Sequence, residues 1–490
     1  MNAPTDQMRK RVRHRDYTFL GLTQSLCPEC HAVVPAKIIA RGKRVYFRKK
    51  CPTHGHREDF VCSDVARYDR LDTSLPAKLP ATTFTQPNKG CPFDCGLCTE
   101  HEQHTCIGVI EITDGCNLTC PMCYAGSAPG RQAKSVDDIK RAIDALVAAE
   151  GRAEVIQLSG GEPTLHPHLL EIVDYALKQP VDYVMINTNG IRLAHDVPLV
   201  AALAEHRSRL EIYFQFDSLD DGQVAALRGQ TGLVEIKLKA LERLAAAQLN
   251  VTLVATLQGG VNESAAADLL DFASNRPEVT GLSFQPATYS GRYVLPEQLE
   301  KRITFPDVID SIAADSRNEF AAEDFFPLPC AHPNCHWLSL AVRDASKLRP
   351  ITKLVDVKQN LDLLANGISF TRGDCQKLAQ QVISRMACGE SGCCTAGISD
   401  AALPIVEDLA PHRSENELIE SFLKRAIEQT AGARDMLRIT VTSFLDAYNF
   451  DVRRVMKCCT HHVLPSGHII PFCAYNVLYR DGKVPLPELS

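Results

Sequence analysis

Between residues 107 and 286, short apolar runs alternate regularly with longer amphipathic stretches. Six continuous apolar runs predict buried strands at 107–113, 153–158, 183–187, 210–216, 250–256 and 281–285. Between them, apolar residues recur at three- and four-residue intervals, which predicts amphipathic helices at 135–149, 166–177, 197–205, 233–247 and 264–274. Continuous apolar strands separated by helices indicate an α/β fold with a parallel sheet. Catalytic loops of such folds lie at the C-terminal ends of the strands.

This alternation of apolar runs and amphipathic stretches is absent before residue 107 and after residue 286. The segment 71–88, with prolines at 76, 80 and 87, has the composition of a linker. Beyond residue 286, helical stretches near 305–314, 354–364, 375–386 and 415–430 are interrupted by loops that carry cysteines. We therefore expect a mainly helical C-terminal unit rather than more of the parallel sheet.

Three cysteines lie on the loop that directly follows the first predicted strand. Cys116, Cys120 and Cys123 have the spacing C-x3-C-x2-C. Three thiolates on one short loop can hold three irons of a [4Fe–4S] cluster and leave the fourth iron open for a substrate. A zinc knuckle is the alternative, but zinc sites usually pair cysteines as C-x2-C and close with four ligands. The spacing therefore favours a catalytic iron–sulfur cluster.

At this loop the chain resembles the radical S-adenosylmethionine superfamily, which shares the spacing and an aromatic residue, here Tyr124, after the last cysteine. The resemblance implies a partial (β/α)6 TIM-like barrel and S-adenosylmethionine on the open iron. It also implies an enzyme that reductively cleaves this cofactor to a 5′-deoxyadenosyl radical, which abstracts hydrogen from an unactivated carbon. We expect Cys116, Cys120 and Cys123 to carry the catalysis.

Polar residues at three further strand ends are candidates for binding S-adenosylmethionine, together with Tyr124. The run 159–163 follows the second strand and resembles the superfamily's methionine-binding motif. Its glycines would let the ligand approach the backbone, and its carboxylate could accept from the ammonium group. Amides and a carboxylate after the third and fourth strands could bond ribose hydroxyls, although turn chemistry also explains the Asn-Gly pair. These candidates are Gly160, Gly161, Glu162, Asn187, Asn189, Gln215 and Asp217.

Two cysteine groups precede the barrel. Cys91, Cys95 and Cys98 repeat the C-x3-C-x2-C spacing, and Cys106 could supply a fourth thiolate, which would make a saturated auxiliary cluster. The second group predicts a small ribbon that binds a single iron or zinc ion. His54 or His56 could replace Cys62 as a ligand in this ribbon. This group comprises Cys27, Cys30, Cys51 and Cys62.

Five C-terminal cysteines could converge on a further auxiliary cluster, and the alternative is that several are buried small hydrophobic residues. They are Cys330, Cys335, Cys458, Cys459 and Cys473. We make no ligand assignment for Cys375, Cys388, Cys393 and Cys394.

The arrangement of all four cysteine groups resembles one branch of the superfamily, the archaeal tetraether lipid synthases and the methanopterin-type methylases. This resemblance implies three cubane clusters, two of them auxiliary, and one rubredoxin-like iron. It implies a transferase that couples lipid chains through sp3 C–C bond formation. The alternatives are a pterin-type C-methylase, a peptide-modifying radical enzyme, and a non-enzymatic iron–sulfur electron-transfer or scaffold protein.

Composition and charge limit the binding partners and the cellular location that we expect for this protein. The chain of 490 residues has a formal net charge of −6, which gives no general reason to bind nucleic acid. Twenty cysteines and an N-terminus without an apolar leader indicate a cytoplasmic protein with metal-bound thiols. The basic stretch 9–15 could touch the inner face of a membrane, or be a solvated tail. We expect a small-molecule or lipid substrate and an external one-electron donor such as ferredoxin or flavodoxin.

These observations predict four units along the chain. They are an N-terminal metal ribbon over 1–75, a linker with an auxiliary cluster loop over 76–106, a radical S-adenosylmethionine barrel over 107–325, and a cluster-binding unit over 326–490.

Overall fold

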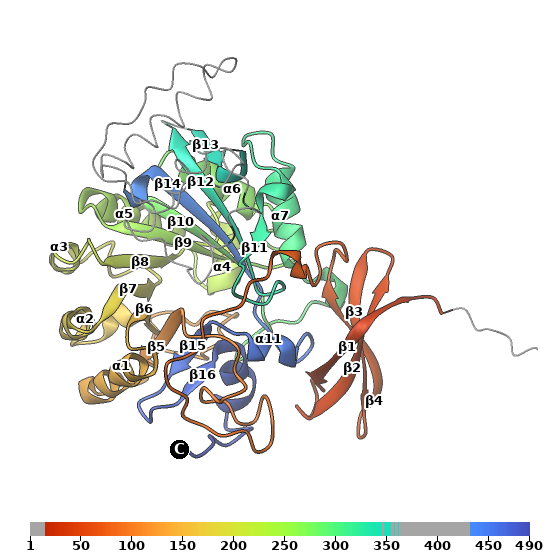
Figure 1. Cartoon of the computed structure of the whole chain (residues 1–490). Helices are drawn as coiled ribbons and strands as arrows, with labels where there is room; N and C mark the ends of the chain where they lie inside the picture. Colours follow the sequence, from red (N-terminus) through yellow and green to blue (C-terminus); the bar gives the residue numbers. More distant parts are fainter. Residues whose placement is uncertain (1–14, 345–346, 354–356, 358–360, 362–431) are drawn as a thin grey trace, which may run out of the picture.

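The computed structural model describes residues 15–344, 347–353, 357, 361 and 432–490. Figure 1 shows a small sheet at one side of a larger α/β body. The larger sheet has 12 strands in the order β11-β12-β14-β10-β9-β8-β7-β6-β5-β15-β16, with β13 paired to β12 outside this path. No helix of the described residues is long and apolar enough to cross a membrane.

The six predicted barrel strands form the centre of the larger sheet and pair in parallel with their neighbours in chain order. This confirms the predicted partial TIM-like barrel. The strands are β5 (Ile107–Thr113), β6 (Ala153–Gly160), β7 (Val181–Thr188), β8 (Leu210–Gln215), β9 (Asn250–Leu257) and β10 (Val279–Pro286).

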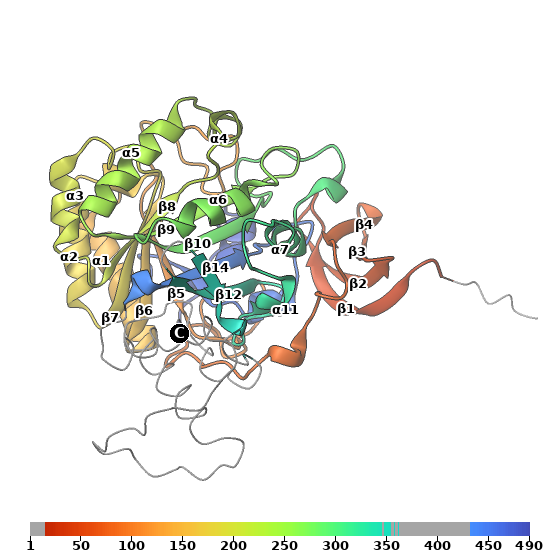
Figure 2. The same ribbon diagram turned by 90° about the horizontal axis from the view of Figure 1, so that it is seen from above.

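Helices follow the strands and cover their outer side, as the view from above shows (Figure 2). The five predicted helices are α1 (Val136–Glu150), α2 (Leu169–Lys178), α3 (Val197–Ala204), α5 (Leu233–Ala246) and α6 (Ala265–Ser274). Helix α1 illustrates the local cause: Ser135 accepts from the Asp138 backbone N–H as N-cap, and Ile139, Ile143 and Leu146 are buried. A sixth helix, α4 (Asp221–Arg228), was not predicted because its apolar stripe is short.

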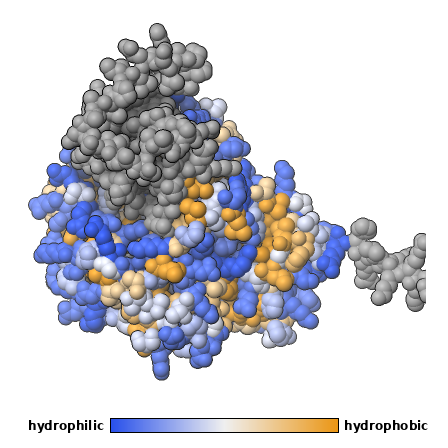
Figure 3. Space-filling view, viewed as in Figure 1, coloured by the Kyte–Doolittle hydropathy of each residue, from blue (hydrophilic) through white to orange (hydrophobic). Residues whose placement is uncertain are grey.

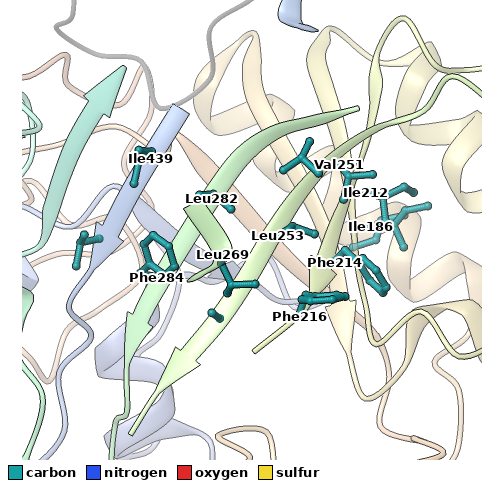
Figure 4. Packing of buried hydrophobic residues seen from close by; sticks show 14 of the residues in the cluster. Ile186, Ile212, Phe214, Phe216, Val251, Leu253, Leu269, Leu282, Phe284 and Ile439 are labelled. Atoms are coloured by element: carbon teal, nitrogen blue, oxygen red, sulfur yellow. The ribbon is translucent and has the colours of Figure 1, made fainter. Parts of the chain in front are cut away.

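The side chains between the strands and the helices form one apolar core. Figure 4 shows Ile186, Phe214, Leu253 and Phe284 from successive strands packed together, with Leu269 of α6 against them. Burying this contiguous surface is what holds the strands in register with their covering helices.

The described part of the segment 326–490 extends this sheet at both ends rather than forming a separate helical unit. Strand β14 pairs in parallel with β10, and β15 pairs in parallel with β5. A partial barrel leaves two open strand edges, and these strands cover them. The strands are β11 (Phe326–Pro327), β12 (His336–Asp344), β13 (Lys347–Pro350), β14 (Met436–Thr442), β15 (Thr460–Val463) and β16 (Ile469–Pro471).

Few helices of this end lie within the described residues. Helix α7 (Phe305–Ala313) agrees with the stretch predicted at 305–314, and α11 (Val452–Met456) and α12 (Phe472–Ala474) are short. The helices predicted near 354–364, 375–386 and 415–430 fall outside the described residues, apart from 357 and 361. The four unassigned cysteines at 375, 388, 393 and 394 do so too.

The N-terminal sheet is an antiparallel ribbon of β1 (Thr18–Leu26), β2 (Val33–Arg41), β3 (Arg44–Cys51) and β4 (Gly55–Cys62), in that order. A buried lysine fastens it to the C-terminal segment, since Lys49 Nζ donates to the carbonyls of Ala447 and Tyr448 at 3.1 and 2.7 Å. Figure 3 shows apolar side chains over this ribbon, where Phe19, Leu20 and Leu22 of the edge strand β1 are exposed.

Candidate functional site

Cys116, Cys120 and Cys123 lie on the loop after β5 and face one cavity of about 180 Å³. The backbone N–H of Leu118 donates to Cys116 Sγ at 3.4 Å, and burial raises the pKa of the Cys116 thiol to about 11. Three thiols that converge on one cavity, with room beyond them, fit a cluster that is held at three irons and open at the fourth. The predicted catalytic cysteines therefore lie together where the sheet strands end.

An arginine that the sequence pattern did not indicate holds this loop. The backbones of Cys123 and Arg292 exchange two hydrogen bonds of 2.9 and 3.0 Å. The Arg292 guanidinium also donates to the carbonyls of Cys120 and Ser127, at 3.2 and 2.7 Å. Arg292 follows β10, so the segment after the sixth strand fixes the loop after the first.

Gly160 and Gly161, at the end of β6, line the same cavity, as predicted. They also contact the backbone just before Cys116. Gly161 N–H donates to the Thr113 carbonyl at 2.7 Å. A Cβ atom added to Gly161 would lie 2.1 Å from the Gly115 oxygen, a distance no side chain tolerates. This position therefore requires glycine, because two strand-end loops touch there.

Glu162, which we predicted to accept from the cofactor's ammonium group, is buried and is not among the residues that line the cavity. Its Oε1 accepts from Thr164 N–H, Thr164 Oγ1 and Thr188 Oγ1, and its Oε2 accepts from Asn189 N–H at 2.7 Å. The donors from Thr188 and Asn189 connect the carboxylate to the end of the next strand, β7.

The amides predicted at the ends of β7 and β8 do line the cavity, as does Tyr124. Asn189 Nδ2 donates to Asn117 Oδ1 at 2.7 Å, which connects it to the cysteine loop. Gln215 Nε2 lies 3.4 Å from Asn187 Oδ1. These amides form a polar wall with spare donors and acceptors for a bound ligand.

Asp217, which we predicted to contact ribose, is fully buried and is not among the residues that line the cavity. Its carboxylate accepts from Arg228 Nε and Nη2 at 2.7 and 2.6 Å and from Thr256 N–H at 3.0 Å. Arg228 is the residue of this pair that lines the cavity, and it lies beside Cys120. The sequence missed Arg228 because it lies on the unpredicted helix α4.

Lys237 is a second cation behind the polar wall. Its Nζ donates to the carbonyls of Asn189 and Gln215 at 3.0 and 2.5 Å. Burial lowers the pKa of Lys237 to about 8. A sequence signal existed, because Lys237 interrupts the apolar face of α5 between Leu233 and Leu241.

The N-terminal ribbon presents a second, separate group of ligand atoms. Cys27, Cys30, Cys51 and His54 each offer an atom within 4.8 Å of the others. Cys30 Sγ lies 3.8 Å from Cys51 Sγ, and Cys27 Sγ lies 3.5 Å from His54 Nδ1. Neighbouring ligands of one tetrahedral zinc ion are spaced by about 3.6–3.8 Å, so the group fits a single metal ion.

Cys62 does not belong to this group, which corrects its prediction as the fourth ligand and favours the alternative, His54. Cys62 pairs with Val45, whereas Cys51 pairs with Gly55 at the other end of β4. Seven residues of strand separate Gly55 from Cys62, or about 23 Å at ~3.3 Å per residue. The Cys62 thiol is buried and donates instead to the Asp64 carbonyl.

Cys91, Cys95 and Cys98 line a smaller cavity together, but Cys106 is not among its lining residues. Cys106 is buried directly before β5 and makes hydrogen-bond contacts with Cys330 and Cys459. This corrects the prediction that Cys106 completes the Cys91 group.

The five C-terminal cysteines lie in two neighbouring sets, and Cys459 is close to members of both. Cys330 and Cys459 lie with Cys106, as described above. Cys335, Cys458 and Cys473 lie near one another and around Arg454, whose Nε donates to Cys335 Sγ at 3.2 Å. Burial, followed by the neighbouring thiols, raises the pKa of Cys458 well above its usual value.

Two parts of the chain match models of known families. Residues 110–273 match the model described as the radical SAM superfamily. Residues 19–63 match the model described as the HMPTM N-terminal zinc ribbon domain.

Some relatives match less than half of the chain. The GTP 3′,8-cyclase of Chlorobaculum tepidum is 27% identical over 45% of this chain and 66% of its own length. Among solved structures, SuiB of Streptococcus suis covers 42% of this chain and 45% of that chain, at 17% identity and a TM-score of 0.35.

One relative spans nearly the whole molecule. The 7,8-dihydro-6-hydroxymethylpterin dimethyltransferase of Methanocaldococcus jannaschii is 33% identical over 95% of this chain and 96% of its own length. With the converging cysteine loop and the barrel, this likeness shows that the chain is an enzyme of the radical SAM superfamily and belongs to the family of that dimethyltransferase.

Proposed function

We propose that this enzyme is a C-methylase that acts on a pterin-type heterocycle. The observation that carries the proposal is the full-length likeness to the pterin dimethyltransferase, which includes the cysteine-bearing segments at both ends. Relatives named for other activities match only 45% and 28% of the chain. The coupling of lipid chains, which the sequence resemblance implied first, has no comparable support from these relatives.

The mixed lining of the cavity also suits a compact polar substrate, because amide side chains such as Gln157, Gln285 and Asn476 face it together with apolar ones. A lipid chain would need a long apolar tunnel. A flat heterocycle needs only a short slot beside the cysteine loop.

The lining chemistry suits a flat ring with polar edges. Phe444 and Phe472 both line the cavity, with ring centroids 4.6 Å apart, and can pack on the face of a heterocycle. Gln157, Gln285 and Asn476 offer amide donors and acceptors to its edges.

The residues present fit the cofactors of the superfamily. Three thiols on one cavity wall suit a [4Fe–4S] cluster, which supplies, when bound, one-electron chemistry on S-adenosylmethionine. In the chain itself, Arg292 holds the loop and Arg228 places positive charge beside Cys120. The polar wall of Asn187, Asn189 and Gln215 would orient the cofactor, and an external donor of the ferredoxin or flavodoxin type would supply the electron.

The test is an anaerobic assay of the iron-reconstituted enzyme with dithionite, S-adenosylmethionine and 7,8-dihydro-6-hydroxymethylpterin. We expect 5′-deoxyadenosine and a methylated pterin, both measured by mass spectrometry. The same assay with a diether lipid tests the alternative. Lipid coupling without pterin methylation would overturn the proposal, and so would the absence of any 5′-deoxyadenosine from iron-loaded enzyme.

Replacing Cys116, Cys120 and Cys123 by alanine should reduce 5′-deoxyadenosine to the background level, because the open cluster loses all three protein ligands. Iron held by the other cysteine groups should remain, which metal analysis can measure. Cys62→Ala is the control, since it removes a buried thiol that lies outside the groups of ligand atoms found among the described residues. Unchanged cleavage in the triple variant would contradict the assignment of these cysteines.

A further inference from the structure

A cluster of buried ligand groups lies at the opposite end of β5 from the catalytic loop. Cys106 directly precedes β5, His104 lies two residues earlier, and Glu154 is the second residue of β6. One ligand atom of each lies within 4.8 Å of the other two. Cys116, in contrast, follows the C-terminal end of β5, so the two sites are separated by the length of the strand.

His104 is oriented as a metal ligand would be. Its Nε2 lies 3.4 Å from Cys106 Sγ and 3.6 Å from Glu154 Oε1. Its Nδ1 lies 3.4 Å from Oε2 of Glu150, whose Oε1 accepts from the Thr105 N–H at 2.8 Å. A histidine that binds a metal through one nitrogen commonly directs the other toward a carboxylate, which fixes the ring and its tautomer.

Several polar atoms here are buried and have few partners. Oε2 of Glu154 has no hydrogen-bond partner among the described residues, and Nδ1 of His104 and Oε2 of Glu150 face only each other, at 3.4 Å. Buried polar groups are normally satisfied, so this cluster requires an explanation. A bound cation would supply one, because it offsets the carboxylate charge and fixes the imidazole.

The spacing of the ligand atoms distinguishes one ion from a cluster. Nitrogen and sulfur ligands of one tetrahedral zinc ion lie about 3.6 Å apart, close to the 3.4 Å between His104 Nε2 and Cys106 Sγ. Thiolates of a [4Fe–4S] cluster bind different irons and are spaced more widely. Cys330 and Cys459 also lie near Cys106 and Glu154, but neither belongs to the group of ligand atoms that lie within 4.8 Å of one another.

We propose that His104, Cys106 and Glu154 bind a single zinc or iron(II) ion at the N-terminal ends of β5 and β6. The site joins the first two barrel strands at the edge opposite to the catalytic loop. It is separate from the ribbon metal site and from the catalytic loop, so it stands whether or not the substrate is a pterin.

Anomalous scattering tests the proposal directly on the full-length protein, crystallised after anaerobic purification. Difference maps collected at the zinc and iron edges should show one single-atom peak bonded to His104 Nε2 and Cys106 Sγ. A zinc signal and an iron signal are both consistent with the proposal and identify the ion. An empty site, or density for four irons at these residues, would overturn it.

Metal stoichiometry in solution provides the second measurement. His104→Ala and Cys106→Ala should each lower the bound metal by one equivalent per chain, while the ribbon retains its ion. Cys62→Ala should retain the full amount, because its thiol lies in none of the groups. A full complement of metal in folded His104→Ala protein would contradict the assignment.

Discussion

Two carboxylates at strand ends show that some residues of this site orient others, which in turn line the cavity. Glu162 follows β6 and Asp217 follows β8, and both are buried behind the cavity wall and hold other residues in place. Burying a carboxylate is costly unless donors satisfy it, and both carboxylates accept several hydrogen bonds. The groups that they orient, Asn189 and Arg228, line the cavity.

Asp217→Asn should destabilise the enzyme by about 3–5 kcal/mol, the usual cost of leaving one buried partner of an ion pair uncompensated. Arg228 would remain charged and buried beside Cys120 without its bidentate acceptor. Anaerobic urea denaturation measures the effect. Glu171→Gln serves as the control, since its ion pair with Lys140 is exposed and its loss should change little. Equal stability of the two variants would contradict this role for Asp217.

At the scale of elements, the site depends on contact between consecutive strand-end loops. The loop after β6 packs against the loop after β5 so closely that Gly161 meets the Gly115 backbone directly. The segment after β10 then bonds to the cysteine loop through Arg292. Parallel pairing places all these loops at one edge, so each of them can adjust the position of the three thiols.

Gly161→Ala should weaken binding of S-adenosylmethionine by at least about tenfold, or ~1.4 kcal/mol, because the added methyl displaces the Gly115 backbone just before Cys116. The far-UV circular dichroism should not change, since the clash is confined to two loops. Equilibrium binding of labelled cofactor to the cluster-loaded enzyme measures the effect. Gly432→Ala is the control, as nothing lies within 4 Å of the added atom and its φ is −137°. Wild-type affinity in Gly161→Ala would show that the loops tolerate the shift.

Over the whole molecule, buried charged side chains connect the two ends of the chain with each other and with the barrel. Arg480 from the C-terminal segment binds Glu111 of β5 with two hydrogen bonds, of 3.1 and 2.6 Å. Lys49 of the ribbon bonds the C-terminal backbone and pairs with Asp59 at 3.0 Å. These contacts couple the ribbon, the C-terminal segment and the first barrel strand into one assembly.

Glu111→Gln should weaken this coupling by about 3–5 kcal/mol in the free energy of unfolding at neutral pH. Burial by itself would raise the pKa of Glu111, but Arg480 outweighs it and lowers the pKa to about 2. A lowered pKa means that the pair stabilises the fold above about pH 4.5 and that this contribution is lost as the pH falls toward 2. Urea midpoints of wild type and variant should therefore converge in acid. The double variant with Arg480→Gln should recover part of the loss, and a purely additive effect would contradict direct coupling.

Local sequence determined the parts of this enzyme that depend on neighbouring residues. The period of apolar positions determined the barrel strands and most of their helices, because strand and helix bury residues at different intervals. The spacing of Cys116, Cys120 and Cys123 determined that three thiols face one cavity, since a short loop limits how far they can separate. Short helices such as α4, with a narrow apolar stripe, lacked that signal.

Tertiary structure alone decided which distant groups meet. Strand register places His54 rather than Cys62 beside Cys51, and it places Cys106 with Cys330 and Cys459 rather than with Cys91. Burial likewise decided that Arg228, not Asp217, reaches the cavity. The physical reason is that distances between segments follow from how strands pair and pack, and the spacing of residues within one segment does not encode that pairing.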